Sequence, residues 1–190
     1  MCLSNRQRRL SLLLAVVPVL LTAGCGAGQK PQARSVELSA GAVAQVKLGT
    51  AATEGEGKLR AMLGEPDEQG SYYCEANNAR YTHLRWSSLE VSMSDLGKGT
   101  PVMSTWTLQR GKRTDRPRPW RLELPYGIGL GVPISDVLRR VPQAAGNYDE
   151  TFGVFRVTAD NDQLWWLSPD PNGHGPVTII ESGGSALLCE

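Results

Sequence analysis

Few side chains of this chain could act as a catalytic base or nucleophile. His83 and His174 are its only histidines, and it contains neither a Gly-x-Ser-x-Gly nor a Ser-x-x-Lys motif. The remaining candidates are two acidic pairs, Asp67-Glu68 and Asp149-Glu150, because a glycosidase needs two carboxyl groups. Both pairs follow a predicted helix in equivalent places, which favours solvated loops. We therefore expect no enzyme, and a carboxylate-based hydrolase is the third and least favoured function.

The motifs for metals and nucleotides are incomplete. Asp160-Asn161-Asp162 lacks the third carboxylate, the glycine and the distal Glu of a calcium loop, so it predicts a hairpin turn. Gly127-Ile-Gly129-Leu-Gly131 has Val132 where a dinucleotide-binding motif requires glycine. We expect neither a metal nor a cofactor.

The first 25 residues have the order of an export signal. Arg6, Arg8 and Arg9 precede an apolar run from Leu10 to Leu21. As a helix, this run would be about 18 Å long, too short for a hydrocarbon core of about 30 Å. One interpretation is a plain secretory signal, with Cys25 free to form a disulfide in the exported chain.

The end of this segment, Leu21-Thr22-Ala23-Gly24-Cys25, resembles the lipobox of bacterial lipoproteins. The resemblance implies that residues 1–24 are removed and that the thiol of Cys25 carries a diacylglycerol. Two acyl chains are the double anchor that stable membrane attachment requires. We therefore expect an extracytoplasmic protein that is anchored to the outer leaflet of the cell membrane through Cys25.

The mature chain would be slightly acidic. No acidic residue precedes Glu37, so removal of residues 1–24 leaves 17 basic and 19 acidic side chains. This balance excludes a net basic field that would attract nucleic acid. Residues 25–40, rich in glycine, proline and polar residues, are predicted to form a flexible tether with a reach of about 20–23 Å.

Two cysteines, Cys74 and Cys189, remain for the folded part of the exported chain. An even pair in an oxidising compartment predicts a structural disulfide. A redox-active pair would need a closer Cys-x-x-Cys spacing, and a metal site built from these cysteines and the two histidines is poorly supported.

Residues 41–190 are expected to form one α+β domain in which a short helix followed by an antiparallel β-meander occurs twice. The pseudo-repeats cover about 44–109 and 120–190, and an Arg- and Pro-rich loop, 110–119, joins them. Each begins with Leu-Gly, followed by a Thr or Ser placed to cap a helix, an acidic residue in its first turn and a proline stop.

After each predicted helix the hydrophobic period changes to two, which indicates strands with one buried face. The predicted strands are 81–86, 89–94, Val102–Leu108, Phe152–Val157, Gln163–Leu167 and Val177–Ile180.

This arrangement resembles the tandem α/β modules of the β-lactamase inhibitory protein type and, as a single copy, small outer-membrane assembly lipoproteins. It is also similar to uncharacterised actinobacterial lipoproteins. The resemblance covers about residues 44–189 and rests on Leu48-Gly49, Gly64-Glu65-Pro66, Leu130-Gly131 and the two late cysteines. Members of these groups act mainly by binding proteins, so the resemblance implies that mode of action.

Two features are candidate binding sites. The Arg-rich loop and its flanks form a basic patch that would suit anionic headgroups or acidic wall polymers, unless it is simply a solvated loop. Trp165 and Trp166 are adjacent on the predicted strand Gln163–Leu167, so their side chains point to opposite faces. One of them is exposed unless both faces of the strand are covered. The candidate binding residues are Trp120, Trp165, Trp166, Arg113, Arg116 and Arg118.

The favoured function is therefore that of a non-catalytic, lipid-anchored envelope lipoprotein that binds a protein partner. The alternative is binding of a cell-wall polymer or carbohydrate through an exposed tryptophan and the Arg-rich loop.

Overall fold

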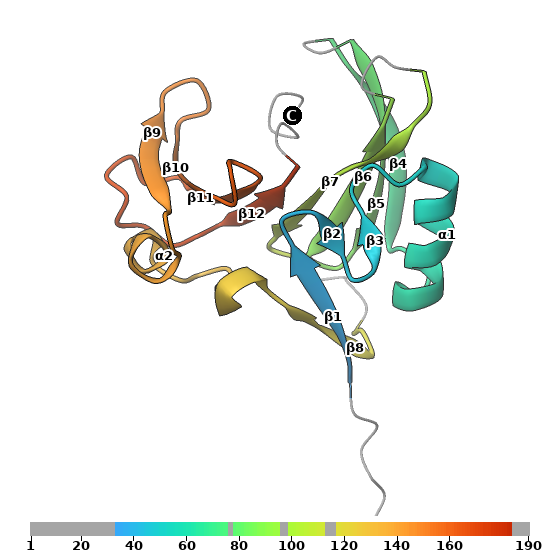
Figure 1. The fold of residues 1–190 in the computed structure, drawn as a ribbon, viewed down its shortest axis with the longest axis horizontal. Helices are drawn as coiled ribbons and strands as arrows, with labels where there is room; N and C mark the ends of the chain where they lie inside the picture. Colours follow the sequence, from blue (N-terminus) through green and yellow to red (C-terminus); the bar gives the residue numbers. More distant parts are fainter. Residues whose placement is uncertain (1–32, 76–77, 96–98, 113–116, 184–190) are drawn as a thin grey trace, which may run out of the picture. The chain divides into compact units, whose positions relative to one another are not determined.

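One eight-stranded antiparallel sheet runs through the folded unit of the chain, which begins at Ala33. The computed structural model describes residues 33–75, 78–95, 99–112 and 117–183. The order of strands in this larger sheet is β4-β5-β6-β7-β12-β11-β10-β9 (Figure 1). Its strands and the two α-helices are α1 (Ala52–Leu63), β4 (Glu68–Cys74), β5 (Ala79–Trp86), β6 (Leu89–Ser94), β7 (Val102–Gln109), α2 (Ile134–Arg140), β9 (Ala145–Asp149), β10 (Val154–Ala159), β11 (Leu164–Ser168) and β12 (Ile179–Ser182).

A smaller sheet has the order β3-β2-β1-β8. Its strands are β1 (Arg34–Ser39), β2 (Ala42–Val43), β3 (Val46–Lys47) and β8 (Trp120–Glu123), and the 3₁₀ turn η1 (Pro125–Gly127) follows β8. The predicted tether was therefore too long, because Val36 and Leu38 of β1 are each only 2% exposed and belong to the core. A strand with two buried apolar side chains is held in place by packing, whatever the composition around it.

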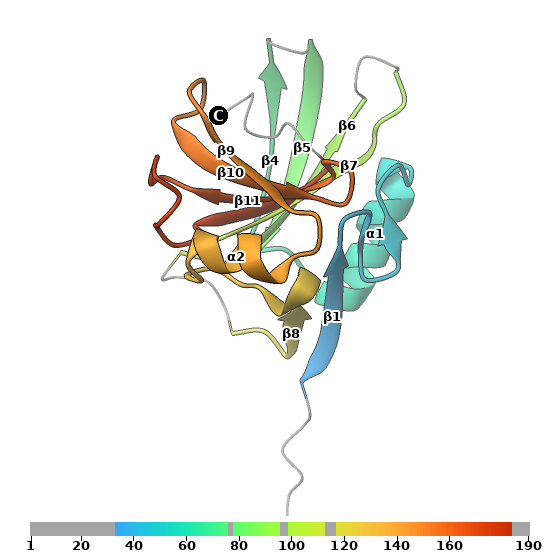
Figure 2. The same ribbon diagram turned by 60° about the vertical axis from the view of Figure 1, so that its left-hand side comes forward.

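The main core lies between the larger sheet and the elements that cover one of its faces, and a smaller cluster contains Cys74, Ala79 and Tyr81. Figures 1 and 2 show α1, α2 and β1 on that side of the sheet. The fully buried Trp106 of β7 and Trp166 of β11 share this core with Leu59 of α1 and Val137 of α2. An α+β fold with antiparallel meanders is therefore confirmed at this level.

The prediction of one buried face per strand was wrong for the first hairpin. On the face of β5 opposite Leu84, Tyr81 is 2% exposed and Arg85 is 8% exposed. Tyr81 stacks on Tyr72 with ring centroids 5.3 Å apart, and Arg85 pairs with Glu68. Polar and aromatic neighbours thus bury this second face, which hydrophobic alternation alone does not indicate.

Both helices begin without a side-chain cap, contrary to the prediction. The N-cap residues are Ala51 and Pro133, and neither forms a capping side-chain hydrogen bond. The first N–H groups of a helix have no partner within the helix, and here backbone carbonyls accept one from each helix. The N–H of Ala52 donates to Pro101 O and that of Ile134 donates to Gly175 O, each at 2.9 Å. The first turns do contain an acidic residue each, as predicted.

The two Leu-Gly dipeptides make the same backbone contacts. Gly49 and Gly131 have φ of +87° and +85°, a conformation that favours glycine. The N–H of Gly49 donates to Met103 O and that of Gly131 donates to Val177 O, both at 2.8 Å. Each dipeptide therefore fixes the start of a helix against the last part of the meander that follows it, with Met103 in β7 and Val177 just before β12.

Six strands were predicted, and all six exist with ends shifted by up to two residues. The structure adds β4, β9 and the four strands of the smaller sheet. Four of these strands lack a run of alternating apolar residues, because β4 and β9 are exposed edge strands and β2 and β3 contain two residues each. The strands β1 and β8 do alternate in burial. Within the described ranges, neither helix is long and apolar enough to cross a membrane.

The junction of the two meanders gives the first testable prediction. At Gly183 (φ +96°) an added Cβ would overlap the carbonyl oxygen of Ser104 in the neighbouring strand, whereas at Gly131 it would meet nothing within 4 Å. Gly131→Ala should lower the free energy of unfolding by about 1–2 kcal/mol through backbone strain alone. Gly183→Ala should cost about 1–3 kcal/mol more, because backbone must move as well.

Urea unfolding of both variants, followed by circular dichroism, measures the difference. Equal losses of stability would mean that the contact between Gly183 and Ser104 is not close.

Candidate functional site

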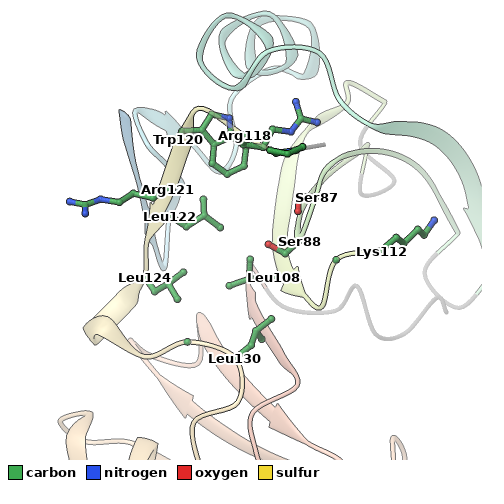
Figure 3. A pocket seen from close by; sticks show the side chains of 13 residues that line it. Ser87, Ser88, Leu108, Lys112, Arg118, Trp120, Arg121, Leu122, Leu124 and Leu130 are labelled. Carbon is green, nitrogen blue, oxygen red and sulfur yellow. The ribbon is translucent and has the colours of Figure 1, made fainter. Parts of the chain in front are cut away.

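An open groove of about 760 Å³ lies between β8 and the end of the larger sheet (Figure 3). Apolar side chains line it from three places: Trp120, Leu122 and Leu124 from β8 and its end, Leu108 from β7, and Leu130 from the segment before α2. In Figure 3, Leu122 and Leu124 point toward the space, and Leu108 and Leu130 lie at its base. Ser87 and Ser88, in the turn between β5 and β6, form the opposite wall.

All charged residues that line the groove are cationic. They are Lys112, Arg118 and Arg121, and no carboxylate is among the lining residues in the described part of the chain. Figure 3 shows Arg121 on the far side of β8, pointing away from the space. An apolar base beside positive charge suits a partner that combines apolar side chains with carboxylates.

Trp120 is placed by the C-terminal end of α1. Its indole N–H donates to the carbonyl oxygen of Leu63 at 3.1 Å, and the indole of Trp86 donates to that of Gly64 at 2.8 Å. The last carbonyls of a helix have no partner within the helix, so these two bonds satisfy them. Trp120 is therefore half-buried, with its polar atom already used and its ring available as a wall of the groove.

Arg118 is held in the structure rather than presented to solvent. Its guanidinium lies 2.5 Å from the carboxylate of Asp67, with side chains only 12% and 9% exposed, and it donates to the carbonyl oxygen of Glu65 at 3.0 Å. Burial alone would raise the pKa of Asp67, but Arg118 and the N–H of Ser87 hold this pKa below its usual value. This ion pair pins the loop before β8 to the end of α1.

Lys112 is the more accessible cation of the groove. It pairs with Glu68 at 2.6 Å, and Glu68 also accepts from the buried Arg85 at 3.0 Å. Lys112 and Arg85 together lower the pKa of the Glu68 carboxyl. Because Lys112 is 61% exposed and Glu68 keeps a second partner, Lys112 can turn toward a bound carboxylate at little cost.

The structure separates the three candidate tryptophans. Trp166 is fully buried, with its ring centroid 6.0 Å from that of Tyr126, so it cannot meet a ligand. Trp165 points to the other face of β11 and is half-buried beneath the guanidinium of Arg156, 4.8 Å from its ring. Only Trp120 lines the groove; Trp165 lies outside its lining.

Of the remaining predicted site residues, only Cys74 is among the described residues. Arg113, Arg116, Cys25 and Cys189 lie outside the described residues, so lipidation and the disulfide stay predictions. Cys74, at the end of β4, is buried at 3% exposure.

The histidines and acidic pairs have structural contacts. His83 was expected to be solvated, but it is half-buried and its ring covers Gly70, where a Cβ would lie 2.6 Å away. His174 is exposed, as expected. Asp67 and Glu68 are both in ion pairs, and Asp149 lies 3.5 Å from Arg156.

Sequence reasoning missed the leucines of the groove. The signal was present: Trp120, Leu122 and Leu124 alternate with Arg121 and Glu123, which is the pattern of a strand with one apolar face.

The Asp67–Arg118 pair gives a prediction with a defined pH dependence. Because the pKa of Asp67 is lowered by folding, its stabilisation is present above the unfolded pKa of about 3.9 and is lost as pH falls through the lower folded value. Asp67→Asn should lower the free energy of unfolding by about 1–3 kcal/mol at pH 7, and by less in acid.

Urea unfolding between neutral and acidic pH measures both effects. Lys112→Gln, which removes an exposed partner of Glu68, should change stability less than Asp67→Asn at pH 7. A constant difference between wild type and Asp67→Asn across the acid range would contradict the assignment.

Comparison with known proteins adds no constraint on this groove. No protein-family model, no curated protein and no solved structure matches the chain. What the groove binds is therefore inferred from the contacts, burial and charge of its own residues.

Proposed function

We propose that this chain is a lipid-anchored extracytoplasmic lipoprotein of the cell envelope that acts by binding another protein, without catalysis. The observation that carries the proposal is the groove beside β8, with its apolar base and cationic margin. Four leucines and one tryptophan edge form a surface that aliphatic side chains of a protein fill well. The volume of about 760 Å³ is that of a binding cleft, and it opens at the surface.

The membrane anchor rests on the order of charge, apolar run and small residues that ends at Cys25. The folded unit starts near residue 33, so the tether from Cys25 to β1 (Arg34–Ser39) is shorter than the predicted 16 residues. A tether of about eight residues has a typical reach of about 14–17 Å, which would keep the groove close to the membrane surface. Partners in the same membrane or on its surface are therefore favoured.

We also propose that the domain arose by duplication of one unit, a helix followed by a four-stranded meander. The equivalent backbone bonds of Gly49 and Gly131 support this, as does the sheet order, in which the last strands of the two meanders, β7 and β12, meet at the centre. Such a duplication would also account for the resemblance to tandem modules that act by binding proteins.

A cell-wall polymer or carbohydrate is the second candidate ligand. The observation in its favour is the stacked pair of Arg156 and Trp165, because an aromatic ring beside a guanidinium suits a sugar with acidic groups. This pair lies outside the lining of the groove, so the two functions would use different surfaces.

For the anchor, Cys25→Ala should abolish incorporation of labelled fatty acid and move the protein from the membrane fraction to the soluble fraction. Cys2→Ala is the matched control, because Cys2 lies in the predicted leader and should change neither result. Unchanged membrane retention of Cys25→Ala would contradict the anchor.

For protein binding, a photo-crosslinking amino acid at Ser88, on the wall of the groove, should capture a discrete protein in intact cells. The same amino acid at Lys58, on the solvent side of α1, is the control and should capture nothing comparable. Capture should also be lost in Cys25→Ala cells if the partner lies at the membrane. Equal capture at both positions, or none at Ser88, would contradict binding in the groove.

A further inference from the structure

The strand β8 is the open edge of the smaller sheet. Its one neighbour in the described chain is β1, with which it pairs in parallel. The N–H of Arg34 donates to Pro119 O at 3.1 Å, and Arg34 is in register with Trp120. In a parallel ladder with this register, the N–H and C=O groups of Arg121 point toward β1 and bond to it. Those of Trp120 and Leu122 point away from β1, toward the open edge of β8.

The backbone groups of Leu122 therefore face outward. Among the described residues no strand lies on that side of β8, and no turn or loop bonds to Leu122. An edge with free N–H and C=O groups is a template for a further strand.

The groove lies where the side chains of such a strand would go. Side chains at paired positions of neighbouring strands lie on the same face of a sheet. Trp120, Leu122 and Leu124 line the groove, so alternate residues of a strand beside β8 would also enter it. They would meet Leu108 and Leu130 there. The groove thus has the place and the character of a missing row of core side chains.

The opposite face of β8 sets the charge of the partner. Arg121 is exposed, has no ion pair among the described residues, and lies on the face away from the groove. A residue paired with it would be on that same face, where a carboxylate is the favoured partner. On the groove side the accessible cation is Lys112, and no carboxylate lines the space. The exposed Glu123 follows on the Arg121 face, in register with Glu37, so a carboxylate of the partner is favoured opposite Arg121 itself.

We propose that the protein partner supplies an extended segment that pairs with β8 as the next strand of the smaller sheet. Its apolar side chains, at every second position, fill the groove, and a carboxylate between them pairs with Arg121. This mode of recognition combines main-chain hydrogen bonds with pockets for alternate side chains. It rests on the proposed protein-binding function and specifies how that function is performed.

The test uses the full-length mature protein in detergent and fluorescein-labelled peptides of about nine residues, in which Val alternates with Glu. Binding is measured by fluorescence anisotropy. A peptide of the same composition with the Val and Glu residues in two blocks should bind at least about tenfold more weakly, because only alternation places every Val in the groove.

Two N-methylated peptides separate strand pairing from simple side-chain docking. One carries methyl groups on the Val amides and the other on the Glu amides. In a strand the N–H groups of neighbouring residues face opposite edges. The affinity of one methylated peptide should therefore fall about tenfold or more, and that of the other should be nearly unchanged. Loss with methylated Val indicates antiparallel pairing, and loss with methylated Glu indicates parallel pairing. Equal effects of the two patterns would overturn the proposal.

Variants of the protein give a second readout. Leu122→Pro removes the outward N–H, which an edge strand tolerates, and Leu122→Ala is the control that keeps this N–H with a shortened side chain. Leu122→Pro should weaken binding about tenfold relative to Leu122→Ala, with similar thermal melting. Arg121→Glu should weaken binding of the Val-Glu peptide and strengthen binding of a peptide in which Lys replaces Glu. If Leu122→Pro does not fold, the Arg121 exchange and the methylated peptides decide.

The remaining outcomes are distinguishable. Failure of all peptides together with specific crosslinking at Ser88 would overturn strand addition and leave protein binding intact. Failure of both would remove both proposals. Sedimentation as a dimer that Leu122→Pro converts to a monomer would identify a second copy of this chain as the occupant and overturn the proposal of a different partner.

Discussion

The antiparallel pairing of β7 with β12 is the interaction on which the rest of the fold depends. It joins the two meanders into one sheet, with Leu108 opposite Ile180 and Trp106 opposite Ser182. Trp106 and Ser182 also reach the smaller sheet, since the indole N–H donates to Ser39 O at 2.8 Å and the Ser182 hydroxyl donates to the carbonyl oxygen of Ala40. The close approach at Gly183 keeps the two central strands in register. Three segments that are distant in sequence are thereby fixed at one point.

The position of the groove follows from a second set of contacts, at the end of α1. Arg118 and Trp120 bind groups of that helix terminus and the loop after it, and this brings the connection between the two halves back across the molecule to β1. The connection then forms the four-residue strand β8, whose one partner strand in the described chain is β1. The result is an open edge beside an apolar groove, a combination that is costly in water unless a partner uses it.

Much of the α+β organisation could be predicted from local patterns. Two-residue alternation located β5, β6, β7 and β11, and the Leu-Gly dipeptides located the starts of both helices, because these signals depend only on neighbouring residues. The groove could not be predicted in the same way. Its walls come from residues between Ser87 and Leu130, and the pairing of β1 with β8 joins positions more than 80 residues apart. Nothing in the local pattern of Arg34–Ser39 specifies a parallel partner.

The candidate residues illustrate the same division. Residue type and order alone predict an exported, lipidated chain and exclude a net basic field, because those inferences depend on composition and on the order of short segments. The roles of Arg118, Trp165 and Trp166 depended on which faces became covered. Arg118 became part of an ion pair, Trp166 part of the core, and Trp165 the partner of Arg156. Burial and pairing are properties of contacts between distant segments, so only the folded chain could assign these residues to structure or to binding.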